Sequence, residues 1–133
     1  MIQSIGIVTL LVRDQDEALD FYVNVLGFEK RVDLQMGEDY RWLTVAPPGG
    51  AGVELTLTLA ETPDQDARVG RQVGSYVAFV LFTNDCRGDF ERLSARGVKF
   101  HGDPKDQAWG LEVVFEDLYG NQIDLVQARP MPN

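Results

Sequence analysis

One pattern of apolar and polar residues occurs twice in this sequence, and this repeat restricts the possible folds more than any other feature. Its landmarks are the pairs Ile7 and Tyr76, Phe21 and Phe90, Gly27 and Gly97, and Glu54 and Asp124, which lie 69, 69, 70 and 70 residues apart. Each copy has the pattern of a strand, a helix and three further strands. We therefore predict a single domain of two βαβββ modules: residues 1–60, a linker at 61–73, residues 74–128, and a frayed tail at 129–133.

The first copy predicts a strand over residues 5–12 and then a helix that Asp14 caps, with Glu17 at the capping-box position. Gly27 is expected to end this helix, because glycine tolerates the positive φ of that position. Further strands are expected from Phe28 onward and at two later places, residues 40–45 and 53–59.

The second copy predicts a strand over residues 75–82 and a helix capped by Asn84 or Asp85. Three more strands are expected after this helix, at residues 98–100, 111–116 and 122–126. Residues 61–72 are polar and lack periodicity, which favours a linker there.

Composition excludes several classes of function. Twelve Lys and Arg against 21 Asp and Glu give a net charge of −9, which disfavours nucleic acid and membrane surfaces as partners. The one cysteine, Cys86, fits a reducing compartment, and no stretch is typical of a signal peptide or a membrane helix, so we expect a cytoplasmic protein. The one histidine, His101, excludes sites that need several histidines from one chain, and we interpret it as a surface loop residue.

Two segments resemble the vicinal-oxygen-chelate superfamily, which includes glyoxalases, bleomycin resistance proteins and dioxygenases. They are GIVTLLVRDQDEALDFYVNVLGF near the start and VFEDLYGNQIDLVQ near the end. The resemblance implies an α+β fold in which the mixed sheets of two βαβββ modules curl around a cavity. It also implies a homodimer.

In enzymes of this superfamily the first and last strands of each module supply metal ligands. The resemblance places these positions at Ile7, Glu54, Tyr76 and Asp124. Ile7 cannot bind a metal and a neutral Tyr76 is a poor ligand, so we expect no metal cofactor. A divalent cation on the two carboxylates is the alternative.

Glu54 and Asp124 lie in the middle of predicted strands, between apolar neighbours. One interpretation is a pair of carboxylates that face the same cavity, with the pKa of at least one raised, acting as a general base or binding a cation. The other is that each carboxylate is hydrogen-bonded or solvated at the rim.

The ligand-binding set that we expect consists of Tyr76 as a hydrogen-bond donor, Trp42 and Trp109 as stacking platforms, and Ile7 and Arg41 beside them. The alternative for the aromatic residues is a purely structural role in the core. Cys86 is expected to be structural.

These observations favour a metal-independent binding protein of the bleomycin-resistance type, which sequesters an amphipathic or aromatic and possibly cationic small molecule. One alternative is a lyase or isomerase that uses Glu54 or Asp124 as its general base. Another is an interaction module without a ligand.

Overall fold

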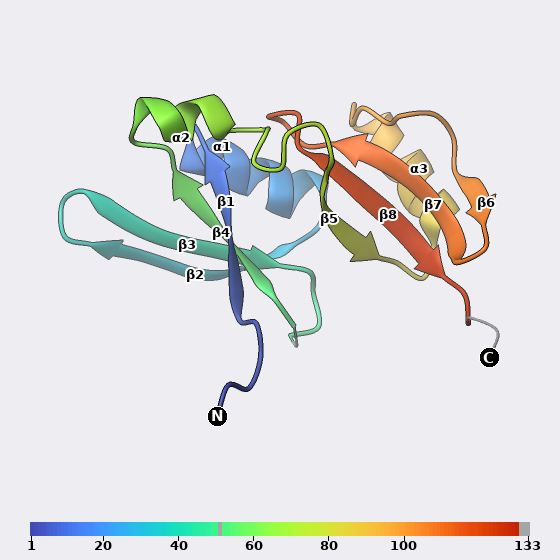
Figure 1. Cartoon of the computed structure of the whole chain (residues 1–133), viewed down its shortest axis with the longest axis horizontal. Helices are drawn as coiled ribbons and strands as arrows, with labels where there is room; N and C mark the ends of the chain where they lie inside the picture. The colour runs from blue at the N-terminus through green and yellow to red at the C-terminus, as the bar shows by residue number, and fades with distance from the viewer. Residues whose placement is uncertain (51, 131–133) are drawn as a thin grey trace. The chain divides into compact units, whose positions relative to one another are not determined.

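The computed structural model describes residues 1–50 and 52–130 and divides the chain into two compact units, Met1–Val69 and Gly70–Asn133. Each unit contains a four-stranded mixed sheet and the element order strand, helix and three strands (Figure 1). The fold is therefore α+β with two βαβββ modules, as the repeat predicts. Most of the expected tail, residues 131–133, lies outside the described residues.

The sheet of the first unit has the strand order β1-β4-β3-β2, with β1 (Ile7–Val12), β2 (Glu29–Met36), β3 (Tyr40–Ala46) and β4 (Glu54–Leu59). β1 and β4 are parallel, and the other neighbours are antiparallel. Helix α1 (Gln15–Asp20) begins where the Asp14 side chain accepts a hydrogen bond from the Glu17 N–H, which confirms the predicted cap. It continues into the π-helical turn η1 (Phe21–Val25).

One face of this sheet packs against α1 and forms the core of the first unit. The buried side chains of that core include Leu10, Val12, Ala18, Tyr22, Leu43, Val45 and Leu57. We call the face opposite α1 the open face of the first unit, because several of its apolar side chains stay exposed.

The sheet of the second unit has the strand order β5-β8-β7-β6, with β5 (Val77–Phe82), β6 (Lys105–Gln107), β7 (Gly110–Glu116) and β8 (Gln122–Ala128). Helix α3 (Cys86–Ala95) packs against β7 and β8 and lies behind them in Figure 1. Of the two caps proposed for it, Asp85 is the correct one, since its side chain accepts a hydrogen bond from the Gly88 N–H. The buried core between helix and sheet includes Cys86, Leu93, Val113, Phe115, Ile123 and Leu125.

The segment expected to be a linker contains a helix, α2 (Pro63–Arg68). Thr62 and Gln65 form a complete capping box at its start, and Pro63 occupies a first-turn position where its missing N–H costs nothing. So short a helix is specified by its cap rather than by apolar periodicity, which explains why the periodicity did not indicate it.

The strand expected at residues 98–100 is wrong in extent. Phe100 makes an isolated bridge with Phe115, and the edge strand of this sheet is β6, further along the chain. Phe100 instead packs its ring between two others, with ring centroids 4.8 Å from Phe90 and 5.4 Å from Phe115. The apolar character that suggested a strand thus reflects an aromatic cluster on the helix side of the sheet.

Candidate functional site: the open faces of the two sheets

Glu54 lies on the open face of the first unit, where it is tied to a neighbouring hydroxyl. Its Cα is in register with that of Ile7 on β1. Its Oε1 accepts a hydrogen bond of 2.7 Å from the Thr44 hydroxyl, and Thr44 Oγ1 in turn accepts one of 3.1 Å from the Val32 N–H. Glu54 is half-buried and Thr44 is fully buried, so the carboxylate is held in one place.

Large apolar side chains gather on the same face at the β2–β3 hairpin. Leu34 is in register with Trp42, and Met36 with Tyr40, so the four side chains share this face. Leu34, Met36 and Tyr40 are 53%, 51% and 45% exposed, and Trp42 is half-buried. Trp42 is thus placed on the face that carries Glu54, with an exposed apolar strip beside it.

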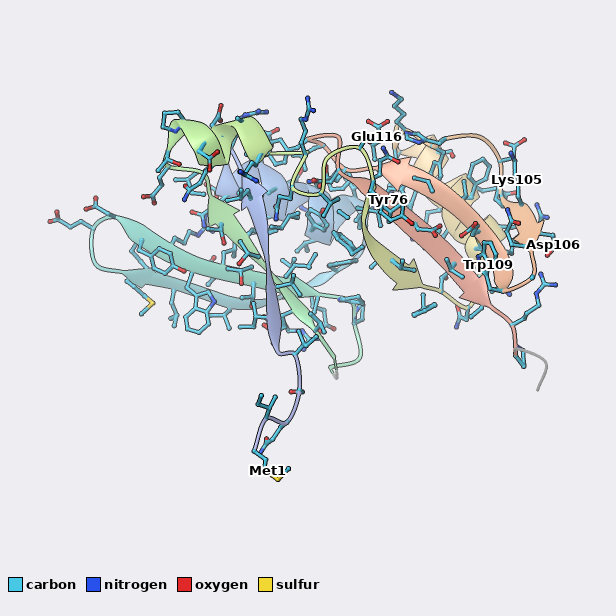
Figure 2. The ribbon with its side chains drawn as sticks, in the orientation of Figure 1. Met1, Tyr76, Lys105, Asp106, Trp109 and Glu116 are labelled. Carbon is cyan, nitrogen blue, oxygen red and sulfur yellow. The ribbon has the colours of Figure 1, made fainter. Side chains whose placement is uncertain are left out.

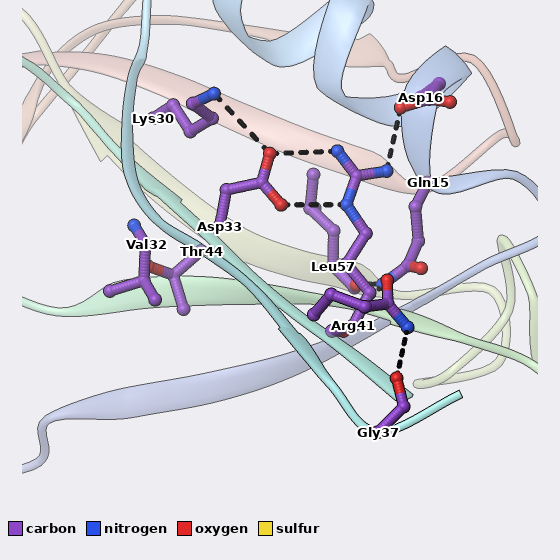
Figure 3. A network of polar contacts seen from close by, with 10 residues as sticks. Gln15, Asp16, Lys30, Val32, Asp33, Gly37, Arg41, Thr44 and Leu57 are labelled. Atoms are coloured by element: carbon purple, nitrogen blue, oxygen red, sulfur yellow. Dashed lines mark hydrogen bonds and ion pairs between the residues drawn. The ribbon is translucent and has the colours of Figure 1, made fainter. Parts of the chain in front are cut away.

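Arg41 lies on the opposite, helix-covered face, away from Glu54 and Trp42. It forms ion pairs with Asp33 on β2, at 2.9 Å, and with Asp16 on α1, at 2.7 Å (Figure 3). The hydrogen bond from Arg41, with a smaller contribution from Lys30, lowers the pKa of Asp33 to about 2. The hydrogen bonds that Arg41 donates to Asp33 and Asp16 raise the pKa of Arg41. This arrangement ties α1 to the sheet, and the structure does not bring Arg41 together with the other expected ligand-binding residues.

The face of the second sheet that lies away from α3, which we call the open face of the second unit, carries two rows of side chains that run across the sheet. In one row, Val80 on β5 and Val114 on β7 flank Asp124 on β8. In the next row, Phe82 and Glu112 flank Val126. Val80 is 47% exposed and Phe82 is 77% exposed, so an apolar edge lies directly beside the carboxylate.

Asp124 is a perturbed carboxyl group. Burial is the main cause that raises its pKa from 3.8 to about 7, and a hydrogen bond that protonated Asp124 donates to Glu112 and the negative charge of Glu112 add to it. Its Oδ1 is buried and has no hydrogen-bond partner among the described residues. A raised pKa was expected for a pair of Asp124 with Glu54, but the neighbouring carboxyl that raises it is that of Glu112.

Glu112 was missed by the sequence analysis, although the sequence contains a signal for it. The tight turn at residues 117–121 joins two alternating strands, and register across such a hairpin decides which residues share a face. The register places Glu112 on β7 and Asp124 on β8 on the same face of the sheet. They are diagonal neighbours across these two adjacent strands. Pairing the strands before choosing candidates would have identified it.

Tyr76 and Trp109 lie outside the centre of this face. Tyr76 precedes β5 and is 77% exposed, and it is Val80 rather than Tyr76 that is in register with Asp124. Trp109 comes just before β7 and is 47% exposed, whereas Glu116 lies at the other end of this strand (Figure 2). The structure therefore places neither aromatic residue at Asp124. That Glu54 and Asp124 face one cavity stays a prediction.

His101, read from the sequence as a surface loop residue, forms an ion cluster at the end of β7. Its Nε2 lies 2.5 Å from Oε2 of Glu116, and Lys99 Nζ lies 3.3 Å from the same oxygen. The hydrogen bond that Glu116 accepts from His101 is the main reason that the pKa of Glu116 is lowered. Glu116 therefore has an ion pair with Lys99 and a hydrogen bond with His101, whereas no such pair is formed by Glu112 among the described residues.

The remaining candidates concern metals and thiol chemistry. Within residues 1–50 and 52–130, no group of three or more His, Cys, Asp or Glu side chains is arranged to hold a metal ion. Cys86 is buried on the helix side of the second sheet, and burial raises the pKa of its thiol, which disfavours the reactive thiolate. No helix in the described part of the chain has the length and apolar character to span a membrane.

Comparison with known proteins identifies the family. A profile of the glyoxalase/bleomycin resistance protein/dioxygenase superfamily matches residues 4–125. The chain belongs to this superfamily. The fold implied by the two sequence motifs is thereby confirmed.

Individual members of the glyoxalase superfamily match over nearly the whole chain. An uncharacterized protein of Shewanella frigidimarina is 46% identical over 128 residues, which cover 96% of this chain and 95% of that protein. The crystal structure of UcmS2 is 35% identical, with a TM-score of 0.84, and covers 96% of this chain and 100% of its own. TnmS3 from Streptomyces sp. CB03234, an antibiotic-binding protein, is 38% identical with a TM-score of 0.80, and the match covers 96% of this chain and 98% of TnmS3.

The link between Thr44 and Glu54 leads to a prediction about stability. Thr44→Val removes the hydroxyl that serves both the Val32 N–H and the Glu54 carboxylate, so we expect a loss of about 1–3 kcal/mol in the free energy of unfolding, measured with urea. Thr58→Val is the matched control, because Thr58 Oγ1 makes only a 3.5 Å contact with a backbone oxygen. Combining Thr44→Val with Glu54→Gln should cost less than the sum of the two single changes. Strict additivity would mean that the hydroxyl does not hold the carboxylate.

Proposed function

We propose that this superfamily member binds a small amphipathic or aromatic molecule without the help of a metal, as a sequestering protein of the bleomycin-resistance type. The observation that carries the proposal is the composition of the two open faces, each of which combines exposed large apolar side chains with a half-buried carboxyl group. Ligand pockets have this character, being mostly apolar with few polar groups. The similarity to TnmS3, an antibiotic-binding protein, supports a small organic molecule as the ligand.

Two of the positions that correspond to metal ligands in the superfamily favour this reading over a metal enzyme. Ile7, which is in register with Glu54, has no donor atom, and the exposed Tyr76 lies outside the strand that pairs with β8. Glu54 already accepts a hydrogen bond from Thr44. These features support binding by apolar contact and hydrogen bonds.

The second candidate function is a lyase or isomerase reaction, and Asp124 is the observation that favours it. A carboxyl group with a pKa of about 7 is suited to take up a proton near neutral pH, because a general base works best when its pKa lies near the working pH. The two candidates differ in the fate of the ligand, which a binding protein releases unchanged and an enzyme converts.

Native mass spectrometry of the untagged protein tests the proposal. We expect particles of twice the chain mass of 14.9 kDa, since the exposed apolar faces favour a homodimer, carrying a small organic molecule and no metal. Incubation with a panel of aromatic antibiotics should add the intact mass of at least one of them. A new product mass would support the enzyme instead, and a stoichiometric transition metal would contradict metal independence.

A further inference from the structure

The open face of the second unit has an order across its strands that the proposed function does not use. Its β5 edge is apolar, with the exposed side chains of Val80 and Phe82. Its centre holds two carboxyl groups. Asp124 is on β8, one strand away from that edge, and Glu112 is on β7, two strands away. An apolar edge beside a centre of negative charge is complementary to a molecule with one apolar part and one cationic part.

The two central carboxyl groups lack a positively charged partner among the described residues. The ion pairs of the second unit engage Asp89, Asp106 and Glu116 instead. Asp124 is in contact with another acid, and its Oδ1 is buried and makes no hydrogen bond in the part of the chain that the structure describes. Buried carboxyl oxygens normally have a partner, so Asp124 holds an unsatisfied acceptor, and its side chain as a whole is only half-buried.

Among the described residues, the basic side chains near Asp124 and Glu112 form no ion pair with either carboxyl group. Lys105 on β6 is in register with Glu112, yet no ion pair joins the two side chains within residues 1–50 and 52–130 (Figure 2 shows Lys105 on β6). Lys99 and His101 are engaged with Glu116 at the end of β7. Cys86 begins α3, and its Sγ lies 3.9 Å from the backbone oxygen of Leu125 in the core between the helix and the sheet.

We propose that this face binds a protonated organic amine joined closely to an apolar body, with the ammonium group on Asp124 and Glu112 and the body on Val80 and Phe82. This inference rests on the proposed small-molecule binding and specifies the class of ligand. Adjacent strands are about 4.8 Å apart, so the nitrogen lies within one or two bonds of the apolar body. A hard metal ion fits less well, because it takes six or more oxygen ligands and the carboxyl groups of Asp124 and Glu112 supply at most four.

A pair of probes with one shape and different charge tests the inference. The probes are 1-naphthylmethylamine and 1-naphthylmethanol, titrated at low salt into the whole 15N-labelled protein and followed by the amide shifts of Phe82, Glu112 and Asp124. A charge-assisted hydrogen bond in place of a neutral one should make the amine bind about tenfold or more tightly. The shifts should be confined to the open face of the second unit.

Variants locate the source of this preference. Glu112→Gln should remove most of the tenfold preference for the amine over the alcohol, and Asp124→Asn should do the same if Glu112→Gln folds poorly. Glu91→Gln removes an equal charge from the exposed side of α3 and should leave the preference intact. The dispersion of the amide spectrum shows that each variant is folded.

The outcomes separate this inference from the proposed function. Equal binding of both probes, or a preference that survives both changes at Glu112 and Asp124, overturns the amine assignment and leaves small-molecule binding in place. If neither probe binds while native mass spectrometry finds a bound organic molecule, the inference alone is overturned. If neither probe binds and no molecule is found, both are overturned.

Discussion

Asp124→Asn should make the protein more stable at pH 8 than the unchanged chain, and it should remove most of the dependence of stability on pH between 5 and 8. The pKa of Asp124 is about 7 in the folded protein and 3.8 ordinarily, so the fold binds this proton more tightly than the unfolded chain does. The stability contributed by the protonated form is full below about pH 4 and is lost as the pH rises through 7. At about 1.4 kcal/mol per pKa unit, the loss is a few kcal/mol.

The asparagine side chain stays neutral at every pH and can donate a hydrogen bond to Glu112, so the variant avoids this loss. Urea unfolding at pH 5, 6, 7 and 8 measures the effect, with Glu91→Gln as the control for a general change in charge. Glu112→Gln should also weaken the dependence of stability on pH. The effect should be partial, because burial is the larger cause of the raised pKa of Asp124. Parallel curves for Asp124→Asn and the unchanged chain would contradict a titration of Asp124 near pH 7.

Gly70→Ala should destabilise the second unit by about 2–5 kcal/mol. Gly70 has a φ of +76°, and an added Cβ would lie 2.0 Å from the backbone oxygen of Tyr119, where nothing flexible can give way. The left-handed backbone costs a non-glycine residue about 1–2 kcal/mol, and the overlap adds about 1–3 kcal/mol. The turn that contains Tyr119 joins β7 to β8, so this close approach supports the two strands that carry Glu112 and Asp124.

Gly74→Ala is the matched control for this prediction. Gly74 has a similar φ of +69°, but an added Cβ would meet no atom within 4 Å. It should therefore show only the backbone cost, and the difference between the two variants in urea unfolding measures the steric overlap. Equal losses would mean that the Tyr119 turn moves aside.

Much of the fold follows from local signals in the sequence. Asp14 and Asp85 stand where their helices begin, and the alternation along residues 53–59 places Glu54 on the face away from the helix. Such signals depend on neighbours in the chain, so one sequence is enough to read them. The two copies reinforce each other, because an ambiguous segment in one copy has a clearer counterpart in the other.

The candidate site was harder to predict, because it depends on which strands are neighbours. Arg41 and Trp42 are adjacent in the sequence and therefore point to opposite faces, so only one of them could share a face with Glu54. Glu112 became visible once the pairing of β7 with β8 was known. Tyr76 came from the family resemblance, as the counterpart of Ile7 in the second copy 69 residues later, and that correspondence assumes equal strand registers in both modules.

The two registers are in fact different, and this matters to anyone who would redesign the protein. In the first unit Ile7 stands beside Glu54, whereas in the second unit, after an irregularity between Val77 and Phe79, Val80 stands beside Asp124. An engineer who transferred a histidine from an aligned metalloenzyme would put it at position 76, before the strand begins. The backbone pairing points to position 80 instead, so grafting between duplicated modules should follow hydrogen-bond register and not residue counting.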